Sequence, residues 1–202
     1  MAARLGVLLA GGRGQRLGLG FPKALLPLSG STLLDRGIAT LRAVCGRVAV
    51  VAPASVPLPL DEALRVDDAP GAEGPLAGMV AGLLSHAFEE AIVLGVDFPL
   101  MRPETLEGIL ARLDGSSAVI PMPGGVPQPL AAAYGPGAVP VLVQALGAGE
   151  RAPTRAILRL RPRFLDDAAI AALPGGAAAF ENLNLPEQLP AIEQRLGAEG
   201  IA

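Results

Sequence analysis

The stretch that decides the fold is residues 5–23, LGVLLAGGRGQRLGLGFPK. Residues 5–10 form a short, largely apolar run that ends in glycines, which indicates a strand buried on both faces of a parallel sheet. Glycine also stands at positions 11, 12, 14, 18 and 20, and glycine lets backbone N–H groups approach an anion closely. Because open α/β sheets hold phosphates directly after their first strand, this loop is predicted to bind a phosphate group.

The same loop carries Arg13, Arg16 and Lys23, which is the only lysine in the chain. The Walker A pattern is excluded, because the lysine follows Pro22 and has no serine or threonine after it. The dinucleotide pattern G-x-G-x-x-G is excluded as well, because Leu17 stands where its last glycine is required. A glycine-rich loop alone is often only a surface turn, but the preceding strand and the three cations favour a phosphate site.

Beyond the loop, short apolar runs alternate with helical patterns. Strands are expected at residues 47–52, 64–66, 91–96, 118–121, 129–134 and 164–166, and helices at 74–88, 103–113, 139–146, 153–160, 186–196 and from a cap at Ser31 to residue 44. This alternation predicts an α/β fold, a single-domain Rossmann-like three-layer sandwich over residues 1–202. Its mostly parallel sheet would have helices on both faces and would bind ligands at the carboxyl ends of the strands.

Composition and charge exclude several classes of protein. The 202 residues are 51% hydrophobic with a net charge of −3, which favours a packed globular chain and disfavours nucleic acid as a partner. Cys45 is the only cysteine, so an internal disulfide and a cysteine-based metal site are excluded. His86 is the only histidine, so a Ser-His-Asp or Cys-His catalytic pair would have no second candidate base. No apolar run is long enough to span a membrane, and a cytoplasmic protein is expected.

Asp97 ends the expected strand at 91–96 and is followed by Phe98 and Pro99. A carboxylate there points into the ligand crevice, where it could bind Mg²⁺ completed by waters and substrate phosphates. An aspartate before a proline is also a common turn residue. The phosphate loop at the same sheet edge favours the metal ligand.

Four arginines, Arg151, Arg155, Arg159 and Arg161, follow in the second half of the chain. We favour a solvated helical face for them, and the alternative is a cradle for an acceptor phosphate.

Several motifs together resemble a known family. The pattern LAGG-x-x-x-R-x-G followed by a lysine resembles the signature of nucleotidyltransferases, including the molybdenum cofactor guanylyltransferases of the MobA type; its residues here are Leu9, Ala10, Gly11, Gly12, Arg16, Gly18 and Lys23. GPLAG at residues 74–78 closely resembles the guanylyltransferase pattern. PQPLAAAY at 127–134 and FENLNLPEQL at 180–189 resemble H-P-L-x-A-L-Y and F-x-N-x-N-T-P-E-D-L of that family.

The resemblance implies transfer of GMP from GTP to molybdopterin with release of pyrophosphate, and Mg²⁺ as the cofactor. It also allows molybdoenzyme-assembly proteins as partners. By resemblance, the residues that bind the nucleotide are Leu9, Ala10, Gly11, Gly12, Arg16, Lys23, Asp67, Gly74 and Asp97. The catalytic residues are Arg16, Lys23 and Asp97, and Asp97 also binds the metal. The acceptor is bound by Gln128, Asn182 and Asn184. Asp67 lies seven positions before Gly74, where the family has its nucleotide-binding aspartate, and Asp68 could exchange roles with it.

Three positions depart from the family pattern: Pro22 replaces an aspartate, Gln128 a histidine and Leu185 a threonine. They leave open a cytidylyltransferase, a sugar- or polyol-phosphate nucleotidyltransferase, and a non-catalytic nucleotide-binding partner of molybdoenzyme assembly. The asparagines Asn182 and Asn184, the only two in the chain, could bind substrate or could equally satisfy loop backbone groups.

Overall fold

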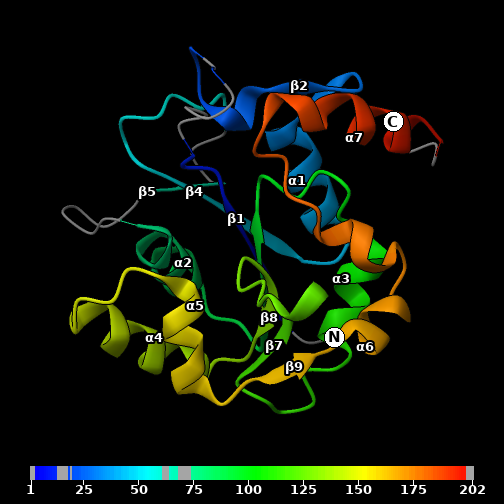
Figure 1. Cartoon of the computed structure of the whole chain (residues 1–202). Coiled ribbons are helices and arrows are strands. Elements are labelled where there is room, and N and C mark those ends of the chain that lie inside the picture. Colours follow the sequence, from blue (N-terminus) through cyan, green and yellow to red (C-terminus); the bar gives the residue numbers. More distant parts are fainter. Residues whose placement is uncertain (1–2, 13–17, 19, 61–63, 68–73, 199–202) are drawn as a thin grey trace.

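The computed structural model describes residues 3–12, 18, 20–60, 64–67 and 74–198, and a seven-stranded sheet crosses it in the order β5-β4-β1-β6-β8-β7-β9 (Figure 1). The strands of this sheet are β1 (Arg4–Leu9), β4 (Arg47–Ala52), β5 (Arg65–Asp67), β6 (Glu90–Gly95), β7 (Ala118–Pro121), β8 (Ala131–Tyr134) and β9 (Arg163–Leu165). Of these strands, β8 alone runs antiparallel to its neighbours, β6 and β7. The mostly parallel sheet expected from the sequence is therefore confirmed.

Helices cover both faces of the sheet (Figure 1). One layer holds α2 (Pro75–Leu84), α4 (Ala138–Gly147), α5 (Pro153–Ala156) and the 3₁₀ turn η5 (Ile157–Leu160); the other holds α1 (Leu33–Arg42), α3 (Pro103–Leu110), α6 (Asp167–Ala171) and α7 (Leu189–Ala198). Shorter pieces are the hairpin β2 (Pro27–Leu28) and β3 (Ser31–Thr32) and the 3₁₀ turns η2 (Lys23–Leu25), η4 (Pro123–Gly125), η6 (Gly176–Phe180) and η7 (Pro186–Gln188). This is the expected three-layer arrangement.

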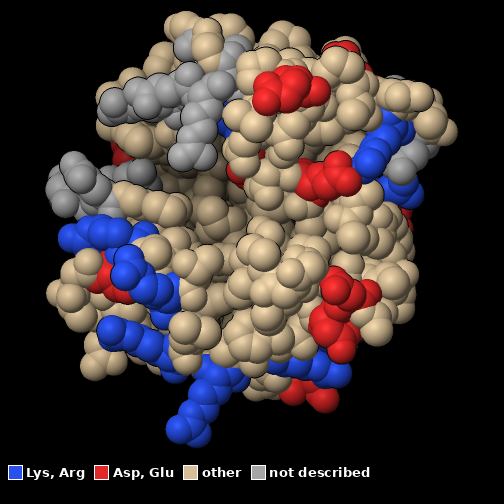
Figure 2. Space-filling view, viewed as in Figure 1, with Lys and Arg blue, Asp and Glu red and all other residues tan. Residues whose placement is uncertain are grey.

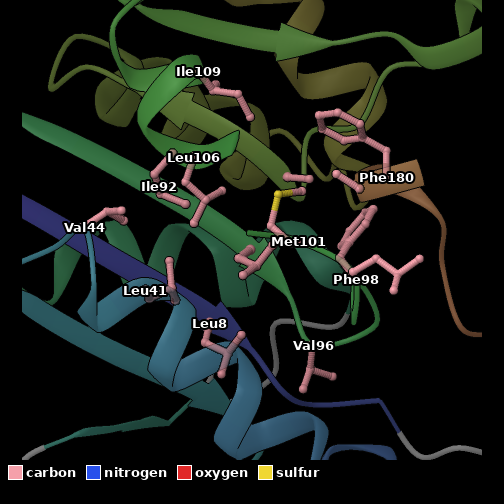
Figure 3. Packing of buried hydrophobic residues seen from close by; sticks show 14 of the residues in the cluster. Leu8, Leu41, Val44, Ile92, Val96, Phe98, Met101, Leu106, Ile109 and Phe180 are labelled. Atoms are coloured by element: carbon pink, nitrogen blue, oxygen red, sulfur yellow. The ribbon is translucent and has the colours of Figure 1, made fainter. Parts of the chain in front are cut away.

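The core lies on both sides of the sheet because successive strand residues point to opposite faces. Leu8 and Ile92 pack with α1 and α3, whereas their neighbours Val7 and Val93 pack with α2. In Figure 3 the first of these clusters runs from α1 across the sheet to α3 and on past the carboxyl end of β6, where Phe98, Met101 and Phe180 join it. The chain that follows β6 is therefore anchored in the core.

Several helix boundaries expected from the sequence are wrong: α1 ends at Arg42 and not at residue 44, α3 ends at Leu110 and not at residue 113, and two others differ in their capping. Thr32, not Ser31, caps α1: the Thr32 hydroxyl accepts from the Asp35 N–H at 3.1 Å, and the Asp35 carboxylate accepts from the Thr32 N–H at 3.2 Å. Ser31 is instead paired with Leu28 in the hairpin. Helix α2 ends at Leu84, before the expected residue 88, and the Ser85 hydroxyl there donates to the Gly82 carbonyl at 2.6 Å.

Across the described ranges, no helix combines the length and the apolarity that a membrane span needs.

Candidate functional site

The site lies where β1 and β6 end side by side. The two strands are parallel, Leu9 pairs with Gly95, and the Val96 N–H donates to the Leu9 carbonyl at 3.1 Å. On the other side of β1, the Ala10 N–H donates to the Val51 carbonyl at 2.8 Å. The start of the glycine-rich loop and the residues after β6 therefore share one edge of the sheet.

Lys23 returns the chain from the loop to this edge. Its N–H donates to the Gly12 carbonyl at 3.1 Å, and the residue is only 8% exposed. Its ammonium donates to Asn184 Oδ1 at 2.9 Å and lies 3.8 Å from Asp97 Oδ2. The structure thus brings together Lys23, Asp97 and Asn184, while Arg16 lies outside the described residues.

Asp97 is held by the C-terminal part of the chain. Its Oδ2 accepts from Asn182 Nδ2 at 3.0 Å, and its backbone carbonyl accepts from the Leu183 N–H at 2.9 Å. Within the described part of the chain, no group of three or more His, Cys, Asp or Glu side chains could hold a metal ion. A single carboxylate nevertheless fits Mg²⁺, because that ion keeps several waters and is completed by substrate phosphates.

Gly95 leaves room for the Asp97 carboxylate. A Cβ added at Gly95 would lie 2.5 Å from Asp97 Oδ1, so the carboxylate would have to turn away. We expect Gly95→Ala to lower kcat about 10²-fold, because a displacement of about 1 Å at a reacting centre can cost that much. Steady-state kinetics of the purified variant, compared with the native chain, measures this loss.

The matched control for that variant is Gly46→Ala. Gly46 is exposed, and a Cβ added there would meet nothing within 4 Å. The control should keep native kcat and Tm, whereas Gly95→Ala should also unfold at a lower temperature, because its Cβ would lie 3.3 Å from the buried Phe98 ring. Native kcat in Gly95→Ala would contradict a strict requirement for the position of the Asp97 carboxylate.

Asp67 and Gly74 lie further along the same edge. Asp67 ends β5, and its carboxylate pairs with Arg65 Nε at 2.8 Å. Gly74 opens α2 with a φ of 96°, and a Cβ there would lie 3.2 Å from the Arg151 carbonyl oxygen, so both backbone and space favour glycine. Asp68 lies outside the described residues.

A cavity of about 540 Å³ adjoins Asp97; it is lined by Pro75, Asp97, Phe98, Pro127, Gln128, Pro129, Leu130, Arg151, Ala152, Pro153, Thr154, Arg155 and Asn182. Figure 2 shows a hollow in this face, with arginine side chains gathered beside it over the region of α4 and α5. Two of the four arginines, Arg151 and Arg155, thus line a cavity besides being exposed to solvent. Asn184 is not among the lining residues.

Polar contacts hold two walls of this cavity. The fully buried Tyr134 donates its hydroxyl to the Pro129 carbonyl at 2.7 Å, and this contact fixes the segment that carries Gln128. At the lining residues Arg151 and Ala152, the backbone N–H groups donate to Glu150 Oε1 at 2.8 and 2.9 Å. These backbone donors lower the pKa of Glu150, and the hydrogen bond from Ala152 has the largest effect. The Glu150 carboxylate also lies 3.4 Å from Arg155 Nε.

Sequence reasoning missed Gln188 as a residue of this region. Its Oε1 accepts from the N–H groups of Asn184 and Leu185 at 2.7 and 2.8 Å. Gln188 makes only the second half of a capping box, because the N-cap residue Leu185 has no side-chain oxygen, and the sequence therefore lacked the usual signature.

Known proteins resemble this chain over most of its length. The family model of the MobA-like NTP transferase domain matches residues 6–167. The chain is 30% identical to a molybdenum cofactor guanylyltransferase of Desulfosudis oleivorans over 207 residues, 100% of both chains. It is 32% identical to a molybdenum cofactor guanylyltransferase of Pseudomonas putida over 186 residues, 91% of this chain and 94% of that one.

Solved structures share the fold. The molybdopterin-guanine dinucleotide biosynthesis protein A from Archaeoglobus fulgidus has a TM-score of 0.79 at 24% identity and covers 96% of this chain and 99% of its own. A 2-C-methyl-D-erythritol 4-phosphate cytidylyltransferase from Thermus thermophilus has a TM-score of 0.69 at 19% identity and covers 95% of this chain and 98% of its own.

Proposed function

The chain belongs to the MobA-like NTP transferase family, and from this premise we propose that it transfers GMP from GTP to molybdopterin and releases pyrophosphate. The observation that carries the proposal is the position of Lys23, bonded to Gly12 at the start of the glycine-rich loop, beside Asp97, which lines a cavity with arginines on its wall. The relatives named as guanylyltransferases match it over nearly their whole length, which favours GTP over the cytidylyl and sugar-phosphate alternatives.

GTP would bind on the loop side of the pair. The backbone of Leu9–Gly12 and the Lys23 ammonium are assigned to the nucleotide, with Arg16 added from the family motif. Asp67 and Gly74, on the same edge beyond β4, are assigned to the base and ribose. Donors fixed in place before the reaction stabilise charge that develops on a triphosphate without reorganising.

Asp97 is the residue that would hold Mg²⁺, and the bound ion would supply positive charge to the triphosphate oxygens. The Lys23 ammonium and the Asn182 amide both meet Oδ2 of this carboxylate, at 3.8 and 3.0 Å, so the fit rests on its other oxygen, Oδ1, with the triphosphate completing the site.

The acceptor would occupy the cavity beside Asp97. Arg151 and Arg155 on its wall suit a phosphate, and Gln128 offers an amide to the same ligand. An oxygen of the terminal phosphate of molybdopterin attacks the α-phosphorus of GTP; that P–O bond forms as the bond from the α-phosphorus to the β-phosphate oxygen breaks. The attacking oxygen is already ionised, so the reaction needs no histidine base.

A turnover assay tests the proposal. The purified chain is incubated with molybdopterin, Mg²⁺ and each of GTP, CTP, ATP and UTP, and pyrophosphate release is measured together with the dinucleotide product. We expect turnover with GTP. A preference for CTP would contradict the guanylyl assignment, and tight GTP binding without pyrophosphate release would favour a non-catalytic assembly partner.

Three expectations from the sequence stay predictions: a single domain over residues 1–202, a cytoplasmic location, and contact with molybdoenzyme-assembly proteins.

A further inference from the structure

We propose that residues 182–188, here called the positioning segment, hold Lys23 and Asp97 in their working geometry, and that Asn184 and Gln188 do so without touching the acceptor. The inference rests on the proposed function, because it concerns how the triphosphate side of that site is built. The segment comes from the far end of the chain, yet it reaches both charged groups.

The two asparagines have opposite roles, and the chemistry of their partners fixes each one. The Lys23 ammonium has only donors, so the atom it meets at 2.9 Å is the amide oxygen of Asn184. The Asp97 oxygen Oδ2 accepts at this contact, so the atom it meets at 3.0 Å is the amide nitrogen of Asn182. Asn184 therefore acts as an acceptor and Asn182 as a donor.

Gln188 acts one step further away. Its side-chain oxygen accepts from the backbone N–H groups of Asn184 and Leu185 at 2.7 and 2.8 Å. Gln188 is not among the residues that line the cavity. Its effect on the site is to fix the backbone from which the Asn184 amide reaches Lys23.

The positioning segment is tied to the core at its start. Leu183 is fully buried, and its N–H donates to the Asp97 carbonyl at 2.9 Å. Just before it, Phe180 belongs to the same buried cluster as Phe98 and Met101 (Figure 3). The segment and the end of β6 therefore form one packed unit, and a shift of the segment would move Lys23 and Asp97 together.

Binding of Mg·GTP without molybdopterin tests the Lys23 half of the inference. Asn184→Leu removes the oxygen that accepts from Lys23 and should raise the Kd about tenfold, measured by calorimetry. Asn184→Ser keeps a neutral oxygen that can accept from Lys23 and should recover part of the affinity. Likewise Gln188→Ala should weaken binding several-fold, and Gln188→Glu, which can still accept from both N–H groups, should restore it.

At Asn182, which contacts Asp97, a carboxylate should not be tolerated. Asn182→Asp replaces the amide donor with a second carboxylate against Asp97, and kcat should fall about tenfold or more. The KM for molybdopterin should stay within about twofold in Asn184→Leu and Gln188→Ala, because neither side chain meets the acceptor. A native Kd for Mg·GTP in Asn184→Leu, together with a raised KM for molybdopterin, would overturn the inference.

Two controls complete the experiment. Glu187→Ala changes an exposed neighbour of Gln188 on the same turn and should bind like the native chain, and Tm values show whether each variant is folded. The nucleotide used is the one of the four triphosphates that the native chain binds most tightly, since Lys23 is assigned to the triphosphate and not the base. A native chain that binds none of the four contradicts the proposed function, and the inference with it.

Discussion

Replacing Asp97 with alanine is expected to lower kcat about 10²- to 10³-fold, the usual loss when one preorganised electrostatic contact is removed. The carboxylate lies at the end of β6, 3.8 Å from the Lys23 ammonium, and adjoins the cavity assigned to the acceptor. Its removal takes away both the proposed metal ligand and the charge that faces Lys23. Single-turnover rates with saturating GTP and molybdopterin measure the effect on the chemical step.

The fold should survive this substitution. The Asp97 backbone carbonyl still accepts from Leu183, and the side chain is 26% exposed, so the Tm should move by no more than about 4 °C. Asp97→Asn is the matched variant: it keeps an oxygen for Asn182 but loses the negative charge, and it should be nearly as slow as Asp97→Ala. Near-native turnover in Asp97→Asn would show that charge and metal binding at this position are not needed.

The sequence predicted the elements that carry the site because their signals are local. Residues 5–10 and 91–96 are continuous apolar runs that end in glycine or aspartate, and parallel strands of this kind place their ends on one edge of a sheet. The structure places Lys23 and Asp97 together there. By contrast, a run of small apolar residues does not specify strand direction, so the antiparallel pairing of β8 could not be predicted from Ala131–Tyr134.

The contacts within the site could not be predicted from spacing. Lys23 and Asn184 lie 161 positions apart, and Asn182 and Asp97 lie 85 positions apart. No periodicity connects residues at such separations, because the contacts depend on how α7 and the segment before it return across the sheet edge. For the same reason, the donor and acceptor roles of the two asparagines became assignable only when their partners were known.

Lys23→Met is expected to lower kcat/KM about 10²- to 10³-fold while the chain still folds. The ammonium is one of the few charges buried in the described part of the chain, with the residue 8% exposed. Methionine leaves the Asn184 oxygen and the Asp97 carboxylate without the ammonium, so the Tm should fall modestly, and by less than in a variant that also loses the stem. Methionine keeps a side chain of similar length, so the packing of the lysine stem beside Gly12 is preserved. The variant therefore measures the effect of losing the charge alone.

Comparison with Lys23→Ala decides why this charge is retained. Alanine removes both the charge and the stem, so it should match methionine in rate but unfold at a lower temperature. Equal losses of rate in the two variants would assign the whole effect to the ammonium, acting on the triphosphate with Asn184 as its support. If Lys23→Met instead kept native turnover and lost only stability, Lys23 would be a structural partner of Asp97 and Asn184, and the nucleotide site would have to depend on the rest of the glycine-rich loop.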